Sequence, residues 1–331
     1  MTTAVVILNW NGKALLEQFL PSVVRYSEEA TVYVADNNSS DDSVAFVAQN
    51  FPTVQIIRNT VNGGYAKGYN DALVHVTEEL LVLLNSDVEV TQNWLSPLIT
   101  AFAQDSKLVA AQPKILDYNR KDTFEYAGAA GGFLDKLAYP YCRGRIFNTL
   151  EEDQGQYSEI APIFWASGAC LFVRNTAFRA VGGFDEDFFA HQEEIDLCWR
   201  LQSKGGNIKY IGSSSVYHVG GATLGAANPK KTFYNFRNTL LVLVKNRKGV
   251  GVWGLILLRL LLDAFAGVQF LIQGKPMHFL AILKAHFSFY SLVGAFLEKR
   301  KKWASNIPYA TVNSIVWAYF VRGKKRAKNL Q

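Results

Sequence analysis

Short apolar runs alternate with longer amphipathic stretches through residues 1–112. The apolar runs predict strands at 4–8, 31–35, 54–57, 80–84 and 108–111. The stretches between them predict helices at 13–26, from the polar cluster after the second strand to about 50, at 66–76 and at 94–103. Pro21 is expected to kink or break the first of these helices. This alternation predicts an α/β domain whose sheet is built from parallel βαβ units.

Three of the predicted strands end in polar or acidic clusters. The clusters are Asn9–Asn11, Asp36–Asp42 and Asn85–Asp87. The strand before the third cluster, Leu80–Leu84, is apolar throughout, as expected for a strand that is covered on both faces. Because ligands bind at the carboxyl ends of the strands in open parallel sheets, we expect the three clusters to form one functional site.

The middle of the chain has a weaker pattern. Residues 112–162 carry scattered Gly, Tyr and Asp, and we interpret them as an irregular insertion or acceptor-binding loop. Order returns near Trp165, and a further helix is predicted to open near His191. The predicted catalytic domain therefore covers 1–244, with halves at 1–112 and 113–244.

From Val250 onward the chain becomes mainly apolar. Val250–Ile272 is long enough to cross a bilayer, which takes about 20 apolar residues, but it carries Arg259 and Asp263. These two residues are four positions apart, so they can pair on one helix face. Met277–Leu297 also gathers its polar residues on one stripe. Both segments are typical of amphipathic helices in a membrane interface, and the alternatives are helices packed on the catalytic domain or true spans.

The charge distribution supports a separate role for residues 245–331. That region holds 15 Lys and Arg but two acidic residues, a formal charge of +13, whereas the rest of the chain carries −7. A basic region rich in Trp, Phe and Leu is typical of a surface for anionic lipid or nucleic acid. Since the same region contains the two apolar segments, we predict a membrane surface and no nucleic acid as its partner.

The composition excludes several classes of protein. A hydrophobic content of 49% and a charged content of 19% exclude a disordered chain. Three widely spaced cysteines, Cys142, Cys170 and Cys198, are too few for a disulfide scaffold or a cysteine-based zinc site. Residues 1–8 lack the basic and long apolar parts of a secretory signal, so we expect the catalytic part to stay in the cytosol.

Acidic residues at the strand ends are the first candidates for chemistry. Asp87 offers the hard oxygen ligand that Mg²⁺ or Mn²⁺ prefers, although Asn-Ser-Asp triplets also occur at turns and helix caps. Asp36 can accept hydrogen bonds from a nucleobase or a ribose, or it can be a turn residue.

A second acidic group comprises Glu193, Glu194 and Asp196. Like charges this close raise at least one pKa, which suits a general base near neutral pH. Acids at a helix N-terminus are also stabilised by the helix dipole, and the two interpretations are compatible.

Basic and imidazole groups follow in the sequence. His218 precedes a Gly pair and is either a metal ligand or a structural histidine. Lys230–Lys231 and Arg237–Asn238 can reach a diphosphate, or they can be ordinary solvated surface.

Nine motifs, each weak alone, occur in an order that resembles the inverting nucleotide-sugar glycosyltransferases of family 2. The resemblance covers about residues 4–245 and is strongest to the rhamnosyltransferase-like branch that builds bacterial surface polysaccharides. The motifs are VVILNWNG from Val5, VADNNSSD from Val34, NGGYAKGYN from Asn62, LLNSDV from Leu83, SGAC from Ser167, GGFDEDFF from Gly182, EEIDLCWR from Glu193, HVGG from His218, and Arg237-Asn238.

The resemblance implies a GT-A fold, an α/β architecture with a mixed, mostly parallel sheet flanked by helices. It implies that Asp36 contacts the base or ribose and that Asp87 and His218 hold Mg²⁺ or Mn²⁺. The family's Asp-x-Asp motif begins here with Asn85, which removes one anionic ligand and gives His218 a larger part in holding the metal. The family usually has Glu-Asp where this chain has Glu193-Glu194, so Glu194 takes the place of the base, with Glu193 or Asp196 as alternatives.

The resemblance also implies further binding residues. The other nucleotide-binding candidates are Asn9, Asn11, Asn38, Asn62, Lys67, Asn85 and Ser86. The acceptor or diphosphate candidates are Trp165, Ser167, Gly168, Arg237 and Asn238.

The expected activity is transfer of a sugar from a UDP or dTDP donor, with dTDP-rhamnose as one candidate, to a hydroxyl of a glycan or lipid-linked acceptor. The expected place is the cytoplasmic face of a bacterial cell membrane, as a peripheral protein, and pairing of the C-terminal helices between subunits is the alternative to lipid contact. The competing functions are an inactive membrane-bound scaffold and a sugar-1-phosphate nucleotidyltransferase, although the Gly-rich loop of the latter is absent after the first strand.

Overall fold

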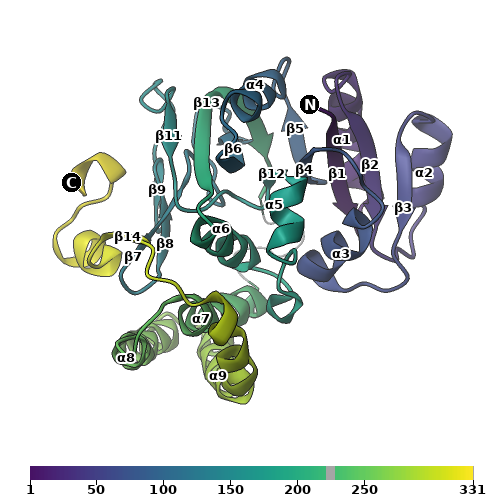
Figure 1. Ribbon diagram of the computed structural model, residues 1–331. Helices are drawn as coiled ribbons and strands as arrows, with labels where there is room; N and C mark the ends of the chain where they lie inside the picture. The colour runs from purple at the N-terminus through teal and green to yellow at the C-terminus, as the bar shows by residue number, and fades with distance from the viewer. Residues whose placement is uncertain (221–227, 331) are drawn as a thin grey trace.

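A computed structural model describes residues 1–220 and 228–330, and it shows a large mixed sheet, a smaller second sheet and a layer of long helices (Figure 1). The large sheet has the strand order β11-β13-β6-β12-β4-β1-β2-β3, with β5 paired to β13. Its strands are β1 (Thr3–Asn9), β2 (Thr31–Asp36), β3 (Gln55–Arg58), β4 (Leu80–Asn85), β5 (Val88–Val90), β6 (Leu108–Asp117), β11 (Ile160–Pro162), β12 (Cys170–Arg174) and β13 (Asn207–His218).

The first four strands of this sheet form the predicted βαβ units. β1 pairs in parallel with both β2 and β4, and β2 pairs in parallel with β3. β12 is antiparallel to β4 and to β6, so the sheet is mixed. The connecting helices are α1 (Lys13–Arg25), α2 (Ser43–Asn50), α3 (Gly64–Leu73), α4 (Ser96–Gln104), α5 (Asn175–Ala180) and α6 (Glu193–Ser203). The predicted α/β class and the mostly parallel arrangement of its first half are confirmed.

Strand β4 is apolar on both faces because helices cover both faces of the sheet. Leu81 and Leu83 pack in the core on the side of α3, α5 and α6, and Leu80, Val82 and Leu84 pack in the core on the side of α1, α2 and α4. All five side chains are fully buried. Successive side chains of a strand point to opposite faces, so such a strand has no polar positions until it ends.

One local prediction was wrong, and one of two alternatives for another is excluded. Helix α1 is not broken at Pro21 but continues to Arg25, with Leu20 buried before the proline and Val23 buried after it. Residues 112–162 are not an irregular loop. They extend β6 and form most of a second sheet of order β10-β9-β8-β7-β14, with strands β7 (Gly132–Asp135), β8 (Pro140–Cys142), β9 (Arg145–Ile146), β10 (Thr149–Leu150) and β14 (Ala310–Val312).

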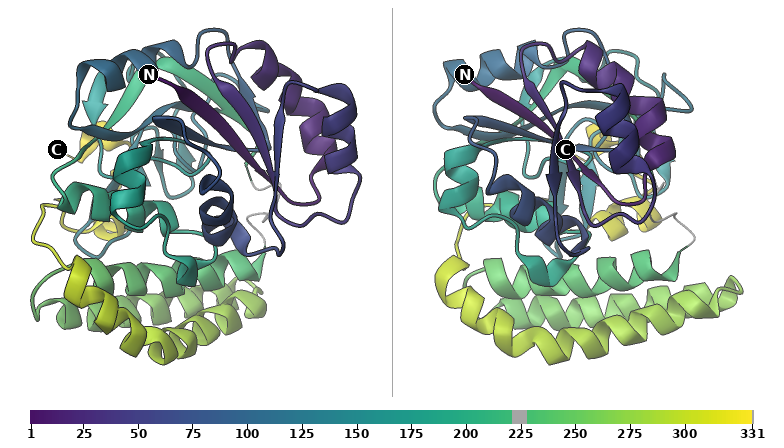
Figure 2. Two further views of the ribbon diagram at one scale, coloured as in Figure 1. Left: turned by 45° about the vertical axis from the view of Figure 1, so that its right-hand side comes forward. Right: turned by 90° about the vertical axis from the view of Figure 1, so that its right-hand side faces the viewer.

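The C-terminal region forms a layer of three helices beneath the α/β part, which we call the helical layer (Figure 2). It consists of α7 (Pro229–Asn246), α8 (Val252–Ile272) and α9 (Pro276–Trp303), and α7 crosses the predicted domain boundary at residue 244. The chain then returns to the second sheet as β14 and continues through short helical turns at Trp317–Val321 and Ala327–Asn329.

A buried charge cluster holds the helical layer against the second sheet. The Arg259 guanidinium donates to the Leu137 carbonyl at 2.8 Å, lies 3.8 Å from the centre of the Tyr139 ring and pairs with Asp263 at 3.5 Å. His286 of α9 reaches the other carboxylate oxygen of Asp263 at 3.2 Å. The predicted pairing of Arg259 with Asp263 is confirmed, and it faces the protein interior.

We expect Asp263→Ala to lower the free energy of unfolding by about 3–5 kcal/mol, because the Arg259 charge would stay buried without its partner. Denaturant unfolding measures this loss. Glu298→Ala is the matched control, since Glu298 is the other acid of residues 245–331 and its side chain is 70% exposed. Equal stability of the two variants would contradict the anchoring role of Asp263.

Candidate active site

The three polar clusters at the strand ends meet at one edge of the large sheet. Asn9 is in register with Asp36 on β2, and its neighbour Leu8 is in register with Asn85 on β4. The Asn9 amide donates to the Asp36 carboxylate at 3.2 Å and to the Ser43 hydroxyl at 2.9 Å. The predicted convergence of these clusters is therefore present in the structure.

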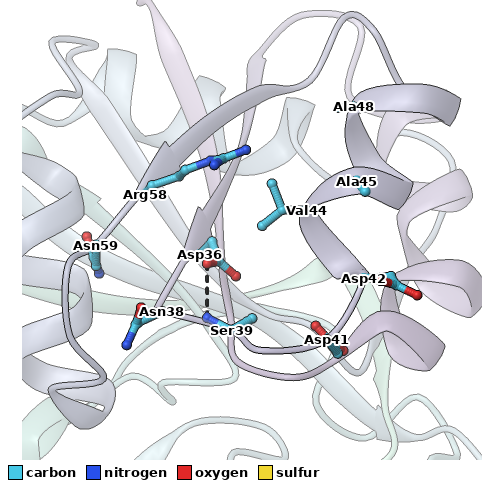
Figure 3. A pocket seen from close by; sticks show the side chains of 10 residues that line it. All are labelled: Asp36, Asn38, Ser39, Asp41, Asp42, Val44, Ala45, Ala48, Arg58 and Asn59. Atoms are coloured by element: carbon cyan, nitrogen blue, oxygen red, sulfur yellow. Dashed lines mark hydrogen bonds between the residues drawn. The ribbon is translucent and has the colours of Figure 1, made fainter.

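A hollow of about 390 Å³ opens beside Asp36, between the ends of β2 and β3 and helix α2 (Figure 3). Asp36 accepts a hydrogen bond from the Ser39 backbone amide at 3.1 Å, and Arg58, its register partner on β3, and Val44 of α2 also line the hollow. The volume is in the range of small-ligand pockets. Asn38 also lines this hollow.

The other predicted nucleotide-binding residues lie around this edge, and several of them brace the loops. The Asn11 side chain accepts from the Ser40 amide at 2.7 Å, and Asn62 accepts from the Gly64 amide at 3.0 Å. Lys67 is held by Asp71 at 2.9 Å. These contacts give the three residues a structural role that does not depend on a ligand.

Asp87 and His218 lie side by side at the end of β4 and β13. His218 Nε2 is 3.1 Å from the Asp87 carboxylate, and the Asn85 amide lies 3.3 Å from the same nitrogen. The other ring nitrogen, Nδ1, is 3.4 Å from Glu125. Burial opposes the charge on His218, but the carboxylates of Glu125 and Asp87 outweigh burial and raise its pKa to about 10.

This pair fits a divalent cation that is only partly enclosed by protein. An imidazole backed by a carboxylate is the usual arrangement of a metal-binding histidine, and Glu125 supplies that carboxylate. No cluster of three or more His, Cys, Asp or Glu side chains suited to a metal exists among residues 1–220 and 228–330. An ion on Asp87 and His218 would therefore complete its coordination with water and with phosphate oxygens of a ligand, as Mg²⁺ commonly does.

Glu193 and Glu194 begin helix α6 and face the same region. Each has one carboxylate oxygen that is buried and has no hydrogen-bond partner among the described residues. Burial raises the pKa of Glu194 to about 7, and burial together with the charge of Glu194 raises the pKa of Glu193 as well. Buried polar atoms without partners are uncommon in folded proteins. The free oxygen of each carboxylate can therefore accept a hydrogen bond from a ligand or bind a proton.

The Cys142 thiol lies in an acidic environment. Burial raises the pKa of Cys142 most, and the negative charges of Glu125 and Glu194 raise it further. The Glu125 carboxylate in turn lies 3.4 Å from His218 Nδ1.

Asp196, the third acid of this group, has a different environment. It is fully buried, pairs with Arg200 at 2.7 Å and Lys245 at 2.8 Å, and accepts from the Asn246 amide at 2.8 Å. Burial favours its neutral form, but the charges of Arg200 and Lys245 outweigh burial and lower its pKa to about 2. A carboxylate with these partners is a structural anion, which argues against Asp196 as the base.

Arg237 and Asn238 hold the segment 187–191, which we call the clamped loop. The Asn238 amide donates to the carbonyls of Phe188, Ala190 and His191 at 3.1, 3.0 and 2.7 Å. The Arg237 guanidinium donates to the carbonyls of Asp187 and Phe188. This loop leads directly into α6.

Backbone strain in the clamped loop explains why it needs these contacts. Phe189, His191 and the next residue, Gln192, have φ values of 63°, 66° and 75°, a left-handed conformation that costs free energy in residues other than glycine. Gly64, also left-handed at φ 76°, packs against Phe189, where a Cβ atom would lie 2.8 Å from the Phe189 carbonyl oxygen.

The predicted acceptor residues divide into two groups. Trp165 is 2% exposed and its indole donates to the Phe133 carbonyl at 3.0 Å, so it packs in the core between the two sheets. Ser167 and Gly168 lie nearer the strand-end edge. The Gly168 carbonyl accepts from the Tyr65 hydroxyl at 2.8 Å. Burial most of all, and then the charges of Tyr69, Glu193 and Glu194, raise the pKa of Tyr65.

Comparison with known proteins agrees with this geometry. The family model "Glycosyl transferase family 2" matches residues 4–179. The chain belongs to glycosyltransferase family 2. It is a glycosyltransferase of a family that uses nucleotide-sugar donors.

Two curated relatives illustrate the range of the family. The N-acetylglucosaminyl-diphospho-decaprenol L-rhamnosyltransferase of Mycobacterium tuberculosis is 27% identical over 264 residues, which cover 74% of this chain and 85% of that protein. The low-salt glycan biosynthesis hexosyltransferase Agl10 of Haloferax volcanii is 23% identical over 209 residues, covering 62% and 63%.

Solved structures confirm the GT-A fold. The mannosyltransferase PcManGT of Pyrobaculum calidifontis, in complex with GDP-Man and Mn²⁺, has a TM-score of 0.53 at 14% identity and covers 90% of this chain and 84% of that chain. S. aureus TarS 1-349, in complex with UDP-GlcNAc, also has a TM-score of 0.53, at 12% identity, and covers 94% and 95%.

Two residues that contact predicted site residues were not identified from the sequence. Glu125, whose carboxylate lies 3.4 Å from His218, is in the segment interpreted as irregular, and no motif marks it. Tyr65, whose hydroxyl donates to the Gly168 carbonyl, lies in the motif NGGYAKGYN, in which Asn62 and Lys67 were the candidates.

We expect Asn238→Ala to lower the free energy of unfolding by about 1–3 kcal/mol, because it leaves buried carbonyls of the clamped loop without a donor. It should also reduce kcat and leave the affinity for UDP or dTDP unchanged. Denaturant unfolding, steady-state kinetics and calorimetry measure the three effects. Asn235→Ala, on the same helix, is the control. Loss of nucleotide affinity with unchanged stability would instead favour direct contact with a diphosphate.

Proposed function

We propose that this glycosyltransferase moves a sugar, with inversion, from a nucleotide-diphosphate donor to a hydroxyl of a lipid-linked acceptor. The observation that carries the proposal is the buried carboxylate of Glu194, which has a pKa of about 7 and one oxygen without a hydrogen-bond partner among the described residues. The hollow beside Asp36 would take the nucleoside. The name of the mycobacterial relative supports rhamnose as the sugar and a lipid-linked diphosphate as part of the acceptor.

In the proposed reaction Glu194 accepts the proton of the acceptor hydroxyl. The hydroxyl oxygen forms a bond to the anomeric carbon from the face opposite the donor's diphosphate, and the bond from that carbon to the phosphate oxygen breaks. The electron pair of the broken bond leaves with the nucleoside diphosphate, so the configuration inverts in one step. A metal ion on Asp87 and His218 would stabilise the negative charge on the leaving diphosphate as a Lewis acid.

The environment of Glu194 suits this role better than that of its neighbours. A base with a pKa near the working pH combines a useful deprotonated fraction with enough basicity. Asp196 is fixed by two cations and is too weak a base, as described above. Glu193 is 5% exposed, so Glu194, which is less completely buried, has better access to an acceptor.

We expect Glu194→Gln to reduce kcat by about 10²–10⁴-fold, the usual contribution of a general base, with little change in donor binding. In the wild type, kcat/KM should fall as the pH decreases through about 7, because the base becomes protonated. Because the folded-state pKa of Glu194 is raised from 4.5 to about 7, the stability that its neutral carboxyl contributes is lost as the pH rises through that window, so Glu194→Gln should not unfold the protein at pH 8.

Steady-state kinetics across pH 5–9 with a panel of nucleotide sugars test this prediction. Glu186→Gln is the control, since its side chain is 46% exposed and pairs only with Lys67 and Asn70 among the described residues. Near-normal turnover by Glu194→Gln, or a pH profile without a step near 7, would remove Glu194 from the role.

We also propose that the helical layer lies on a membrane. Helices α8 and α9 are long and apolar enough to cross a bilayer by length and composition alone. Arg259 near the middle of α8, however, is bound to the second sheet, which keeps α8 alongside the protein. The outward face carries exposed apolar side chains, including Leu257 at 62%, Phe265 at 73% and Phe287 at 75%. Isolated exposed apolar residues are ordinary, but a continuous face of them marks an interaction surface.

We expect the double variant Phe265→Asp, Phe287→Asp to bind vesicles of mixed anionic and zwitterionic lipid at least about tenfold more weakly. The reason is that charges replace two aromatic side chains that would insert into the lipid. Vesicle co-sedimentation measures the change, and circular dichroism checks the fold. Val74→Asp is the control, since Val74 is 62% exposed on the α/β part. Undiminished vesicle binding with a change in oligomeric state would assign this face to subunit contact.

A further inference from the structure

Two cations gather around the ring of Tyr126, beside the candidate active site. Tyr126 is 45% exposed, and the Arg145 guanidinium lies 4.6 Å from the centre of its ring. Lys231 Nζ lies 5.4 Å from the same centre. Arg145 comes from β9 in the second sheet and Lys231 from the first turn of α7, so two separate elements supply the charges.

Arg145 is buried without a charged partner. It is 6% exposed, and its nearest polar contact is a weak one, from Nη2 to the Cys142 sulfur at 3.5 Å. Its Nε atom has no hydrogen-bond partner in the described part of the chain. No carboxylate of that part lies within 4.0 Å of Arg145 or of Lys231. A buried cation is costly unless an anion pairs with it, so this arrangement is incomplete.

The position of Lys231 is unfavourable for the helix that carries it. The N-terminus of a helix bears partial positive charge, which disfavours lysine there. The first turn of α7 contains no acid. Burial and the charge of Arg145 lower the pKa of Lys231, and Glu125 offsets this only in part. Two cations and a helix N-terminus together make a site with an excess of positive charge.

The site opens on the same region as the reacting groups. Tyr126 follows Glu125, whose carboxylate lies 3.4 Å from His218 Nδ1. Lys231 is on α7, and the ring of Tyr234 on the same helix lies 6.4 Å from the ring of His191, two residues before Glu193. An anion held here would lie close to the proposed base but on the side of the second sheet and the helical layer.

We propose that Arg145 and Lys231 bind a phosphate or diphosphate group of the acceptor, beside the Tyr126 ring. This inference rests on the proposed function and specifies its acceptor as a sugar joined to a lipid through phosphate. In the proposed function, Asp87 and His218 hold the metal ion that binds the donor's diphosphate, and the hollow beside Asp36 binds the donor's nucleoside. The second sheet and α7 connect the site to the helical layer, where the lipid chain would lie.

Binding of inorganic pyrophosphate tests the site without turnover. The titration uses the full chain in EDTA with saturating UDP, and separately with saturating dTDP. We expect the wild type to bind pyrophosphate and Lys231→Met to bind it about 10–100-fold more weakly, because a charge-assisted contact is lost. Lys230→Met is the matched control, since Lys230 is adjacent and exposed, and it should change binding by less than about twofold. Arg145→Met serves as a second variant.

Three outcomes would overturn the proposal. Displacement of pyrophosphate by UDP or dTDP would assign the site to the donor, and equal binding by Lys231→Met and Lys230→Met would show that these side chains form no anion site. Absence of pyrophosphate binding to the wild type would also show that Arg145 and Lys231 form no anion site.

Kinetics then connect the site to the acceptor. Lys231→Met should raise KM for a sugar linked to lipid through diphosphate and leave KM for the donor unchanged. With an alkyl glycoside of the same sugar, which lacks phosphate, Lys231→Met and wild type should react alike. A raised donor KM would overturn the proposal. If the wild type transferred no sugar while pyrophosphate binding still depended on Lys231, the proposed function would fail and the anion site would stand.

Discussion

The constraint on which the active site depends is the left-handed backbone at the end of the clamped loop. Phe189, His191 and Gln192 adopt a conformation that costs free energy, and the amide of Asn238 offsets that cost by donating to three carbonyls around them. The turn that results directs the first residues of α6, Glu193 and Glu194, toward the strand-end edge. A relaxed loop would leave these carboxylates in water, where their pKa values would return to the ordinary range and the base would be weaker.

The charged partners of neighbouring acids on helix α6 set their pKa values in opposite directions. Glu194 and Asp196 are two residues apart and both buried, yet the pKa of Glu194 rises to about 7 and that of Asp196 falls to about 2. Arg200 and Lys245 stand beside Asp196, and no cation stands beside Glu194 among the described residues. One acid therefore anchors the helix as a permanent anion, and the other can exchange a proton at neutral pH.

Local sequence patterns were enough to predict the α/β architecture and the convergence of the polar strand ends, but not the contacts of the other candidate site residues. Buried strands with polar ends, such as Leu80–Leu84, predict both the sheet and the edge at which ligands bind, because both follow from local patterns. The roles of Arg237 and Asn238 could not be predicted, because a motif shows which residues matter but not what they touch. The second sheet was missed because strands as short as Arg145–Ile146 have no periodicity to detect, and Glu125 was lost with it.

The helical layer is bound to the segment that leads into the candidate active site. Asn238 and Lys245 reach the α6 region from α7. Lys299 of α9 pairs with Asp185 at 2.5 Å, just before the clamped loop, and with Asp187, the first residue of that loop, at 2.6 Å. Lys245 joins the same Asp185 at 2.7 Å, so α7 and α9 are bound to one acid ahead of that loop. A force that moves the layer, such as docking on a bilayer, acts on the loop through these ion pairs. The residues that would meet the lipid and those that would position the base therefore belong to one connected structure, which gives a physical reason for their occurrence in a single chain.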